Sequence, residues 1–373
     1  MLIGVPREIK PQEFRVGLTP ESVAELTARG HSVLVESGAG AGIGAGDDAY
    51  RSAGAGIVER AAELFAATEL IVKVKEPQAG ERQMLRVGQV LFTYLHLAPD
   101  PDQARDLVAS GAVCIACETV TDALRGLPLL KPMSQVAGRM AVQAGAWALE
   151  REHGGRGVLL GGVPGVAPAR VVILGGGVVG FNAAQMAVGL QGDVTVLDRD
   201  PAVLERLSNH FGASVRVVYS NRTTIEEHLR RASLVIGAVL IPGAAAPRLV
   251  TRSHLAGMTP GAVLVDVSID QGGCFETSRP TTHAQPTFVE EGIVHYCVAN
   301  MPGAVPHTST YALNNATLPH VLALADKGWR QALRDDPHLR AGLNVCLGRV
   351  THAAVALALG YPVAAIDDLL GAP

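Results

Sequence analysis

Aromatic side chains are scarce in this chain: phenylalanine, tryptophan and tyrosine together make up 4% of its 373 residues. A surface that stacks unpaired bases needs several aromatic rings, so the composition does not indicate a binder of single-stranded nucleic acid. Charge is also nearly balanced, with 31 lysine and arginine residues against 35 aspartate and glutamate residues. The formal net charge of −4 argues against the basic face that is typical of nucleic-acid-binding proteins.

Cysteine is uncommon as well. The five residues, Cys114, Cys117, Cys274, Cys297 and Cys346, form an odd set in a long chain, which predicts reduced thiols rather than a disulfide framework. Cys114 and Cys117 are spaced as C-x-x-C inside an apolar run. A metal site needs further ligands and a redox site needs a loop and a helix start, so the spacing favours structural thiols.

The sequence also lacks an uninterrupted hydrophobic segment of membrane-spanning character. The first ten residues carry charge at once and contain no long apolar stretch, so no signal peptide is predicted. Residues 171–191 carry no charge, but they contain three consecutive glycines followed by Gly180, and a strand, turn and helix describe them better than a membrane span. We therefore expect a cytoplasmic protein that has neither a membrane nor a nucleic acid as a partner.

Apolar sequence is abundant in shorter runs, since 48% of the residues are hydrophobic and the length suits two domains. In the first part, apolar runs alternate with helical patterns. Thr19, Pro20 and a closing Gly30 predict one capped helix between them. The alternation predicts parallel βαβ units with right-handed crossovers. The expected strands are 2–5, 32–36, 70–75, 90–96 and 112–117.

A second alternating series begins near Ser134. A helical stretch over 136–152 is expected to join the domains, and the strands that follow it are typical of a complete doubly wound unit. The tail from about His307 shows no strand pattern, and we expect its helices to pack on the first domain. The strands expected in this second series are 171–174, 194–198, 215–219, 234–239 and 263–267, and the expected helices of the tail are 313–327 and 346–359.

These patterns together predict an α/β protein with two doubly wound Rossmann-like domains joined by long helices. The first domain is expected to be discontinuous, spanning 1–128 plus 307–373, and the second to span 129–306.

A glycine-rich turn provides the most specific local signal. Gly175, Gly177 and Gly180 form G-x-G-x-x-G between an expected strand and an expected helix, and Asp198 ends the next expected strand. In a dinucleotide site the glycines allow a tight turn and close approach of the pyrophosphate, and the acid binds the ribose. The alternative is an ordinary turn followed by an exposed aspartate. The matching strand, helix and acid favour an NAD site.

Two titratable residues lie at expected strand ends. His96 closes the run 90–95, where ligands bind in open α/β sheets, and its ordinary pKa suits proton transfer. Asp270 follows the strand 263–267 and could lie beside a nicotinamide. A hydrogen-bonded structural histidine and a turn aspartate before two glycines remain open as alternatives.

Two cations are weaker candidates. Lys75 ends the run 70–74, and alternation puts Lys73 on the same face. Arg15 precedes the capped helix, and a guanidinium can bind a small carboxylate at two points. Without other information, lysines protecting a sheet edge and a surface arginine are the favoured interpretations.

Eight short motifs distributed over the chain together resemble the bacterial L-alanine dehydrogenase family, and the resemblance runs from Met1 to at least Ala358. It implies NAD-dependent, reversible oxidative deamination of L-alanine to pyruvate and ammonium by a cytoplasmic homohexamer. The motifs are V-P-R-E-I-K at 5–10, R-V-G-L-T-P at 15–20, K-V-K-E-P at 73–77, Y-L-H-L-A at 94–98, P-M-S-Q-V-A-G-R at 132–139, G-G-V-P-G-V at 161–166, D-Q-G-G-C at 270–274 and N-M-P-G-A-V-P at 300–306.

The same resemblance implies a role for each candidate. Arg15 and Lys75 would bind the substrate, His96 would be the general acid and base, and Asp270 would position water and substrate. The first domain would then be catalytic and the second would bind NAD. The implied cofactor-binding residues are Ser134, Gly175, Gly177, Val178, Val179, Gly180, Asp198, Ser220, Val239, Leu240, Val267, Ile269, Arg279, Val298, Asn300 and Met301.

This chain departs from the family pattern at a few positions. Val203 and His307 stand where a basic residue is usual, which puts one contact near the adenosine ribose in doubt. Ala323 and Lys327 replace a metal-binding pair of some relatives, so no metal site is expected. Two alternative functions remain, the NAD-binding component of a proton-translocating transhydrogenase and a lysine- or saccharopine-type dehydrogenase.

Overall fold

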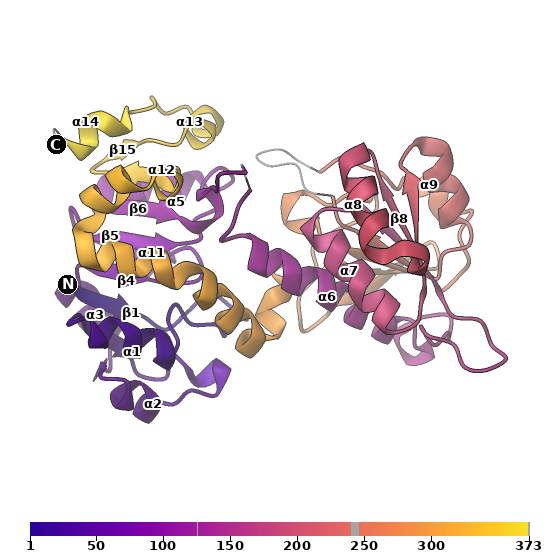
Figure 1. The fold of residues 1–373 in the computed structure, drawn as a ribbon, viewed down its shortest axis with the longest axis horizontal. Coiled ribbons are helices and arrows are strands. Elements are labelled where there is room, and N and C mark those ends of the chain that lie inside the picture. Colours follow the sequence, from indigo (N-terminus) through magenta and orange to yellow (C-terminus); the bar gives the residue numbers. More distant parts are fainter. Residues whose placement is uncertain (125, 240–245, 372–373) are drawn as a thin grey trace. The chain divides into compact units, whose positions relative to one another are not determined.

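The computed structural model describes residues 1–124, 126–239 and 246–371, which form two compact units. The first unit consists of Met1–Met133 and Val305–Pro373, and the second is Ser134–Ala304 (Figure 1). The chain enters the second unit within helix α6 (Lys131–Ala148) and leaves it just before helix α11 (Pro306–Asp335). The sequence had suggested borders at 128/129 and 306/307.

An eight-stranded sheet forms the centre of the first unit, in the order β15-β14-β6-β5-β4-β1-β2-β3. Strands β1 to β6 are parallel, while β14 pairs antiparallel with β6 and β15 pairs antiparallel with β14. The strands are β1 (Leu2–Val5), β2 (Ser32–Glu36), β3 (Gly56–Val58), β4 (Leu70–Val72), β5 (Val90–Thr93), β6 (Val113–Ala116), β14 (Leu343–Cys346) and β15 (Arg349–Val350).

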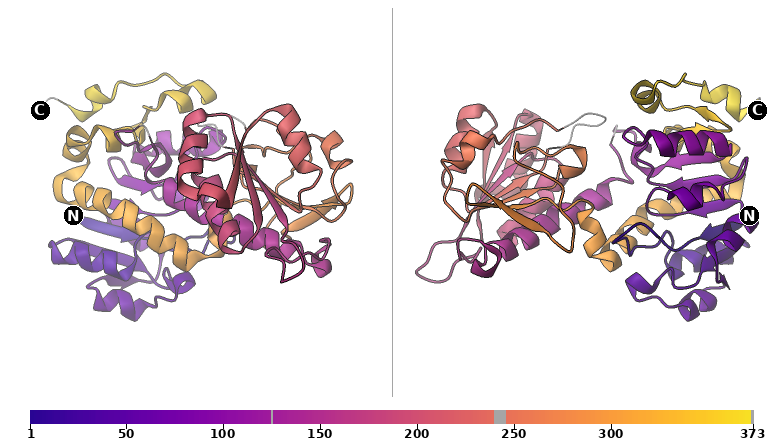
Figure 2. Two further views of the ribbon diagram at one scale, coloured as in Figure 1. Left: turned by 45° about the vertical axis from the view of Figure 1, so that its right-hand side comes forward. Right: turned by 180° about the vertical axis from the view of Figure 1, so that it is seen from behind.

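Helices cover this sheet, and the first of them begins as the sequence predicts: the Thr19 side chain accepts a hydrogen bond from the Ser22 N–H, with Pro20 in the first turn. Helix α11 crosses one face (Figure 1), and the view from behind shows other helices over the opposite face (Figure 2). The helices are α1 (Pro20–Ala28), η1 (Ala41–Ile43), α2 (Asp47–Ser52), α3 (Ala61–Ala67), α4 (Ala79–Arg82), α5 (Pro101–Ser110), η2 (Cys117–Thr119), α11, α12 (Pro337–Arg340), α13 (Ala353–Leu359) and α14 (Ile366–Leu370).

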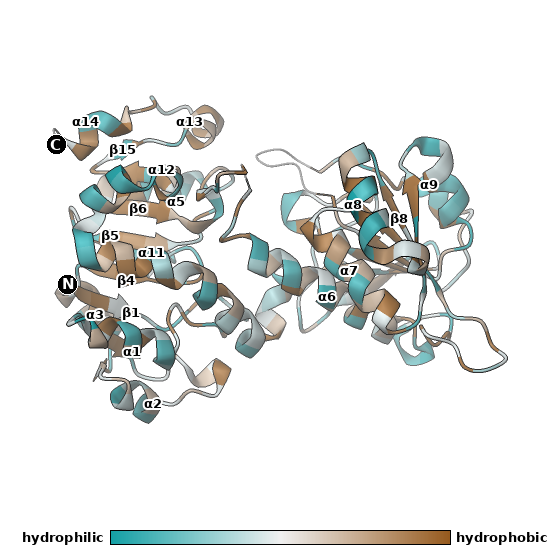
Figure 3. Ribbon diagram, viewed as in Figure 1, coloured by the Kyte–Doolittle hydropathy of each residue, from teal (hydrophilic) through white to brown (hydrophobic). Residues whose placement is uncertain are grey.

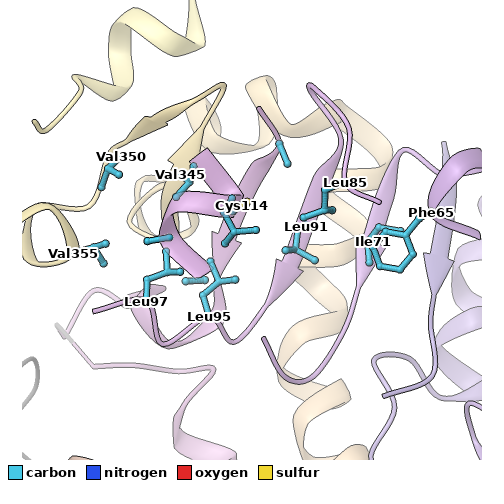
Figure 4. Packing of buried hydrophobic residues seen from close by; sticks show 14 of the residues in the cluster. Phe65, Ile71, Leu85, Leu91, Leu95, Leu97, Cys114, Val345, Val350 and Val355 are labelled. Atoms are coloured by element: carbon cyan, nitrogen blue, oxygen red, sulfur yellow. The ribbon is translucent and has the colours of Figure 1, made fainter. Parts of the chain in front are cut away.

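One hydrophobic core of the first unit forms where alternate strand residues meet α3, α5 and α13 (Figure 4). Ile71, Leu91, Cys114 and Val345 come from β4, β5, β6 and β14 and are fully buried. Since successive strand side chains point to opposite faces, this core uses every second residue and leaves the others for the other face. Figure 3 accordingly shows the central strands of this sheet mostly in the brown of hydrophobic residues.

The structure corrects the expectation for the tail. The segment 346–359 was expected to be helical, but β14 ends at its first residue, Cys346, and β15 follows within it, so only α13 is helical there. The helix expected over 313–327 is longer and is interrupted at Gly328, where φ is 72°. The strands are too short for their alternation to show in the sequence. Strand β14 is defined by its pairing with β6, and β15 by its pairing with β14.

The second unit is built on a seven-stranded sheet in the order β12-β13-β11-β10-β7-β8-β9, parallel except for β12. The order of the strands changes direction between β7 and β10, with β8 and β9 on one side and β11 and β13 on the other, which is the switch point where such sheets bind ligands. The strands are β7 (Arg170–Leu174), β8 (Asp193–Asp198), β9 (Val215–Tyr219), β10 (Leu234–Gly237), β11 (Val263–Asp266), β12 (Thr287–Glu290) and β13 (Ile293–Tyr296).

The expected strands of both units are present, some of them shorter than predicted, which confirms the predicted fold class. The sequence analysis missed β3, β12 and β13. No helix within the described ranges combines the length and the apolar character that crossing a membrane requires. The helices of the second unit are α6 in its larger part, η3 (Arg151–His153), α7 (Val178–Gly189), α8 (Pro201–Phe211), η4 (Gly212–Ser214), α9 (Arg222–Leu229), α10 (Arg252–Leu255), η5 (Ile269–Gln271) and η6 (Met301–Ala304).

Candidate functional site

Polar side chains gather at the carboxyl edge of the first unit's sheet. Lys75, His96 and Glu118 follow β4, β5 and β6, which are parallel neighbours, so the three residues emerge at the same edge. Arg15 lies in the loop after β1, the strand on the other side of β4. The structure thus brings together three of the predicted site residues on one edge, where open parallel sheets bind ligands.

Arg15 is a buried residue, with 2% of its surface exposed, so the surface alternative is wrong. Its Nε donates to Glu13 Oε1 at 2.7 Å, and its Nη1 lies 2.9 Å from the Met133 sulfur. Burial alone would lower the pKa of Arg15, but the hydrogen bond and the charge of Glu13 outweigh it and raise the pKa. The guanidinium is therefore a fixed cation held by a buried carboxylate.

Helix α11 holds the loop that carries Arg15. The Asn314 side chain accepts from the Thr19 N–H at 2.9 Å and donates to the Gly17 carbonyl at 3.1 Å. A side chain at Gly17 would place its Cβ 2.3 Å from the Val72 carbonyl oxygen, so only glycine fits between this loop and β4. Helix α11, from the C-terminal part of the chain, therefore positions the loop of Arg15.

The two lysines after β4 differ sharply in environment. The Lys73 side chain is 0% exposed and is paired with Glu8 and Glu81, whereas Lys75 is half-buried. Strand β4 lies between β5 and β1 inside the sheet, so the interpretation of these lysines as protection of a sheet edge is wrong. Lys75 is the one placed to meet a ligand at the carboxyl edge.

His96 has an unusual backbone conformation, with φ at 48°, in the left-handed region. Its N–H donates to Glu118 Oε1 at 2.6 Å, and its Nδ1 lies 3.9 Å from the same oxygen. The imidazole stacks on Tyr94 with 5.9 Å between ring centroids, and its side chain is 45% exposed. A solvent-accessible imidazole beside a carboxylate can accept and donate a proton.

Sequence reasoning missed Glu118, although the same signal that selected His96 could have found it. Glu118 is the first acidic residue after a fully apolar strand, and its side chain is 13% exposed. Its two oxygens also accept from the Leu95 N–H, both at 3.2 Å. It fixes the backbone of the His96 loop.

In the second unit, the glycine-rich turn joins β7 to α7 as predicted, with Gly177 as the residue before the helix. Gly175 has φ at 102°, and a Cβ there would lie 2.7 Å from the Ala238 oxygen. A Cβ at Gly180 would lie 1.8 Å from the Gly175 oxygen. The turn is therefore too tight for any other residue at 175 or 180, and the N-terminus of α7 is suited to a phosphate.

Asp198 is the last residue of β8, adjacent to this turn. Its Oδ2 accepts from the Gly176 N–H at 2.6 Å, and its Oδ1 accepts from the Asp200 N–H at 2.9 Å. Arg206 donates to the Gly176 carbonyl at 2.9 Å. A carboxylate ordered beside the turn fits the ribose of a dinucleotide, and the glycines fit its pyrophosphate.

Most other predicted cofactor residues follow the carboxyl ends of the same parallel strands. Ser220 follows β9, Val239 follows β10, and Ser268 Oγ donates to the Val239 carbonyl at 2.6 Å. Leu240 lies outside the described residues. Arg279 lies elsewhere, with its guanidinium 4.2 Å from the Phe288 ring centroid. Of the others, Ser134 belongs to α6, Val178 and Val179 to α7, Val267 and Ile269 follow β11, and Val298, Asn300 and Met301 follow β13.

Asp270 is exposed in η5, after β11. The residue that anchors its loop, Asp266, was not predicted. Asp266 is 0% exposed and accepts from the N–H groups of Ser268 and Cys274 at 3.0 Å each and from Ser278 Oγ. Burial raises the pKa of Asp266, and these hydrogen bonds oppose the rise. An aspartate within the apolar run 263–267 is the signal that could have identified it.

Comparison with known proteins agrees with this arrangement. Residues 4–137 match the family model "Alanine dehydrogenase/PNT, N-terminal domain", and residues 141–353 match "Alanine dehydrogenase/PNT, C-terminal domain". The chain is similar to the alanine dehydrogenase of Halomonas elongata, with 58% identity over 100% of both chains. It is similar to that of Mycolicibacterium smegmatis, with 54% identity over 97% of this chain and 98% of the other.

Solved structures give the same result. A structure described as L-alanine dehydrogenase matches with a TM-score of 0.94 and 52% identity, covering 96% of this chain and 99% of the other. A transhydrogenase from Sinorhizobium meliloti matches with a TM-score of 0.83 over 94% of this chain and 100% of the other; at 24% identity this shows a shared fold. With both family models matched in order and more than half of the residues identical to whole relatives, the chain belongs to the alanine dehydrogenase/PNT family.

Proposed function

We propose that this protein catalyses the reversible, NAD-dependent oxidative deamination of L-alanine to pyruvate and ammonium. The observation that carries the proposal is the carboxyl edge of the first unit, where Arg15, Lys75 and His96 follow adjacent strands. A guanidinium and an ammonium suit a small carboxylate with a neighbouring carbonyl oxygen, and an imidazole suits proton transfer. The first unit is then the catalytic domain and the second the NAD domain.

The second unit supplies the cofactor site in this proposal. Its glycine-rich turn and the Asp198 carboxylate fit the pyrophosphate and the ribose of NAD, as the close approaches at Gly175 and Gly180 indicate. When bound, NAD accepts the hydride from the Cα atom of the amino acid. The remaining predicted cofactor residues at the carboxyl edge of this sheet complete the site.

The residues of the first unit perform the other steps. Arg15 holds the substrate carboxylate, and its own orientation is fixed by Glu13. The Lys75 ammonium stabilises negative charge on the substrate oxygen as it becomes a carbonyl. His96 takes a proton from the water that adds to the imino carbon and gives it to the amino group of the resulting carbinolamine. It then takes the hydroxyl proton as the C–N bond breaks and the carbonyl forms, and passes it to the departing ammonia, which leaves as ammonium. Glu118 stabilises the protonated imidazole. Asp270 assists by positioning water and substrate.

The test is whether the purified protein alone produces NADH from NAD and L-alanine, and consumes NADH with pyruvate and ammonium. Lysine and saccharopine replace alanine in parallel assays. Turnover of alanine, together with no turnover of lysine or saccharopine, supports the proposal. Preference for lysine or saccharopine would indicate the other dehydrogenase type, and NAD binding without turnover of any amino acid would indicate a nucleotide-binding component.

We further propose that the protein is a cytoplasmic homohexamer. The support is its resemblance to the family and the apolar helix α13, whose Leu357 side chain is 87% exposed. The apolar stretch 350–359 of the expected helix 346–359 begins at Val350, which instead belongs to β15. Single exposed hydrophobic side chains are ordinary on protein surfaces, so the resemblance carries this proposal, and Leu357 is the position at which to test a subunit contact of α13.

A further inference from the structure

Three buried charged side chains form a cluster directly behind the segment that carries Lys75. The Lys73 ammonium lies 3.1 Å from Glu8 Oε2 and 2.7 Å from Glu81 Oε1, and all three side chains are at most 2% exposed. Taking three charges out of water is costly, and a buried ion pair often stabilises a fold no better than apolar residues of the same size. The cluster therefore calls for an explanation other than stability.

Glu8 also binds the main chain of the neighbouring segment. Its Oε1 accepts from the N–H of Val74 at 2.7 Å and from the N–H of Lys75 at 3.3 Å. Both amides lie beyond Val72, the last residue of β4. On the other side, Thr93 Oγ1 donates to the Lys75 carbonyl at 2.9 Å. The backbone of Lys75 is thus held at its N–H and at its C=O.

The charge of Lys73 determines how the Glu8 carboxylate is oriented. Burial alone would lower the pKa of Lys73, but Glu8 and Glu81 outweigh it and raise the pKa, so Lys73 is protonated. Its ammonium engages Glu8 Oε2, which leaves Oε1 directed at the two amides. Glu81 is fixed in turn, because its Oε2 accepts from the Gln78 N–H at 2.7 Å.

We propose that Glu8 and Lys73 are positioning residues for Lys75: the Glu8 carboxylate, oriented by the Lys73 ammonium, fixes the main chain from which the Lys75 side chain reaches the substrate. This inference rests on the proposed function, because it takes Lys75 as a substrate-binding group. Neither residue contacts the substrate in this scheme. Their effect appears in substrate affinity and turnover and not in cofactor affinity.

The decisive variant is Glu8→Gln, which keeps the size of the side chain. An amide presents one acceptor and one donor, so it must place a donor against either the Lys73 ammonium or the Val74 and Lys75 N–H groups. We expect the dissociation constant of pyruvate from the NADH complex, measured by calorimetry without ammonium, to rise about tenfold or more. Misplacing a substrate-binding group by roughly 1 Å can cost about a hundredfold. The kcat/KM for alanine should fall by a similar factor, while the affinity for NADH is unchanged.

Asp47→Asn is the matched control. Asp47 is also a carboxylate that accepts from a main-chain amide, that of Gly38 at 2.9 Å, but it bonds to Ser37 and Gly38 and not to the segments of Glu8 or Lys75. Pyruvate affinity within twofold of the wild type in folded Glu8→Gln would overturn the inference. An equal loss in Asp47→Asn would do so as well, since it would indicate a general effect of removing a carboxylate that binds the main chain.

If Glu8→Gln does not fold, the triple variant Glu8→Gln/Lys73→Met/Glu81→Gln removes all three charges of the cluster together, which a fold tolerates better than loss of one partner. The same loss of pyruvate affinity is expected, because the amides again lack the oriented carboxylate. Lys75→Ala separates the two proposals. If the wild type binds pyruvate and Lys75→Ala does not, an unaffected Glu8 variant contradicts only this inference; if Lys75→Ala binds pyruvate normally, the proposed role of Lys75 is wrong.

Discussion

The main-chain N–H of His96 donates a 2.6 Å hydrogen bond to the Glu118 carboxylate, and the imidazole Nδ1 lies 3.9 Å from the same oxygen. One carboxylate therefore stabilises both the left-handed backbone at His96 and, when it forms, the imidazolium. A non-glycine residue with positive φ is costly unless its surroundings hold it. Such strain at a strand end is expected where a side chain is directed to a ligand.

His96→Ala is expected to remove most turnover, because a positioned acid or base typically contributes about a hundredfold or more. NAD binding should be nearly unaffected, since the glycine-rich turn and Asp198 lie in the other unit. Steady-state kinetics with calorimetry of NAD binding measure both quantities.

Asp270→Asn should likewise lose most turnover, and Glu118→Gln should lower kcat by a smaller factor than His96→Ala. Wild-type kcat in His96→Ala would contradict the proposed proton transfer.

Arg15 and Lys75 are expected to act on substrate affinity and not on cofactor affinity. Lys75→Ala should abolish activity. Arg15→Ala would leave the Glu13 carboxylate buried and unpaired, which costs about 3–5 kcal/mol of stability, so Arg15→Lys is the more informative variant. It keeps the charge but loses the two-point contact with a carboxylate. Calorimetry should show weaker pyruvate binding in these variants. Weaker NAD binding with unchanged pyruvate affinity would show instead that Arg15 and Lys75 act on the cofactor and not on the substrate.

Gly180→Ala and Gly189→Ala form a matched pair in helix α7. A Cβ at Gly180 would lie 1.8 Å from the Gly175 oxygen, whereas at Gly189 it meets nothing within 4 Å. We expect Gly180→Ala to lose NAD binding or to unfold the second unit. Gly189→Ala should leave binding intact and stabilise the helix by up to about 1 kcal/mol. NAD titration and thermal unfolding check both, and normal NAD affinity in Gly180→Ala would show that the close packing is not needed.

The carboxylate of Asp198 is expected to make NAD the preferred cofactor, because it repels the 2′-phosphate of NADP. Asp198→Gly should weaken NAD binding, since the bonds to Gly176 and Asp200 are lost too. The variant should also show a smaller preference for NAD over NADP, because Arg199 is then available to bind the 2′-phosphate of NADP. Asp193→Asn, at the opposite end of β8, is the control. The measurement is kcat/KM for both cofactors, and an unchanged ratio in Asp198→Gly would refute the role of this carboxylate.

Light scattering at micromolar concentration is expected to give the mass of a hexamer. If α13 contributes to the subunit contact, Leu357→Lys should lower this mass, because a buried charge disfavours an apolar interface. Val87→Lys serves as a control, since Val87 is 79% exposed and lies outside any helix. A monomer mass for the wild type would exclude the hexamer, and an unchanged mass for Leu357→Lys would exclude α13 from the interface.

Strong periodic signals allowed most strands, the helix cap at Thr19 and the glycine-rich turn to be predicted from the sequence, because these depend on local residue types. The pair β14 and β15 could not be predicted in the same way. These strands are short, and β14 exists because β6, distant in the sequence, offers its edge. Likewise, the burial of Lys73 and Arg15 depends on Glu8, Glu81 and Glu13, which the charge pattern alone does not pair.

In the candidate site, too, local sequence patterns predict some residues, while others depend on contacts between distant parts of the chain. His96, Lys75 and Asp270 were detectable because each follows an apolar run, and a strand end in a parallel sheet faces a ligand site. Glu118 and Asp266 were not predicted, although they also lie at the carboxyl ends of strands. The same rule, applied to every expected strand, would have selected them. The positioning role inferred for Glu8 depends on distances to Val74 and Lys75 that no spacing in the sequence reveals.

The first unit is assembled from the two ends of the chain, which has a consequence during synthesis on the ribosome. The second unit ends at Ala304, so it is complete before any residue of α11 or β14 has been made. Domains generally fold as units while the chain grows at about 5–20 residues per second. During that interval β6 is an open sheet edge, which is a template for pairing with another nascent chain. The growing chain therefore exposes this edge until β14 has been made, late in translation.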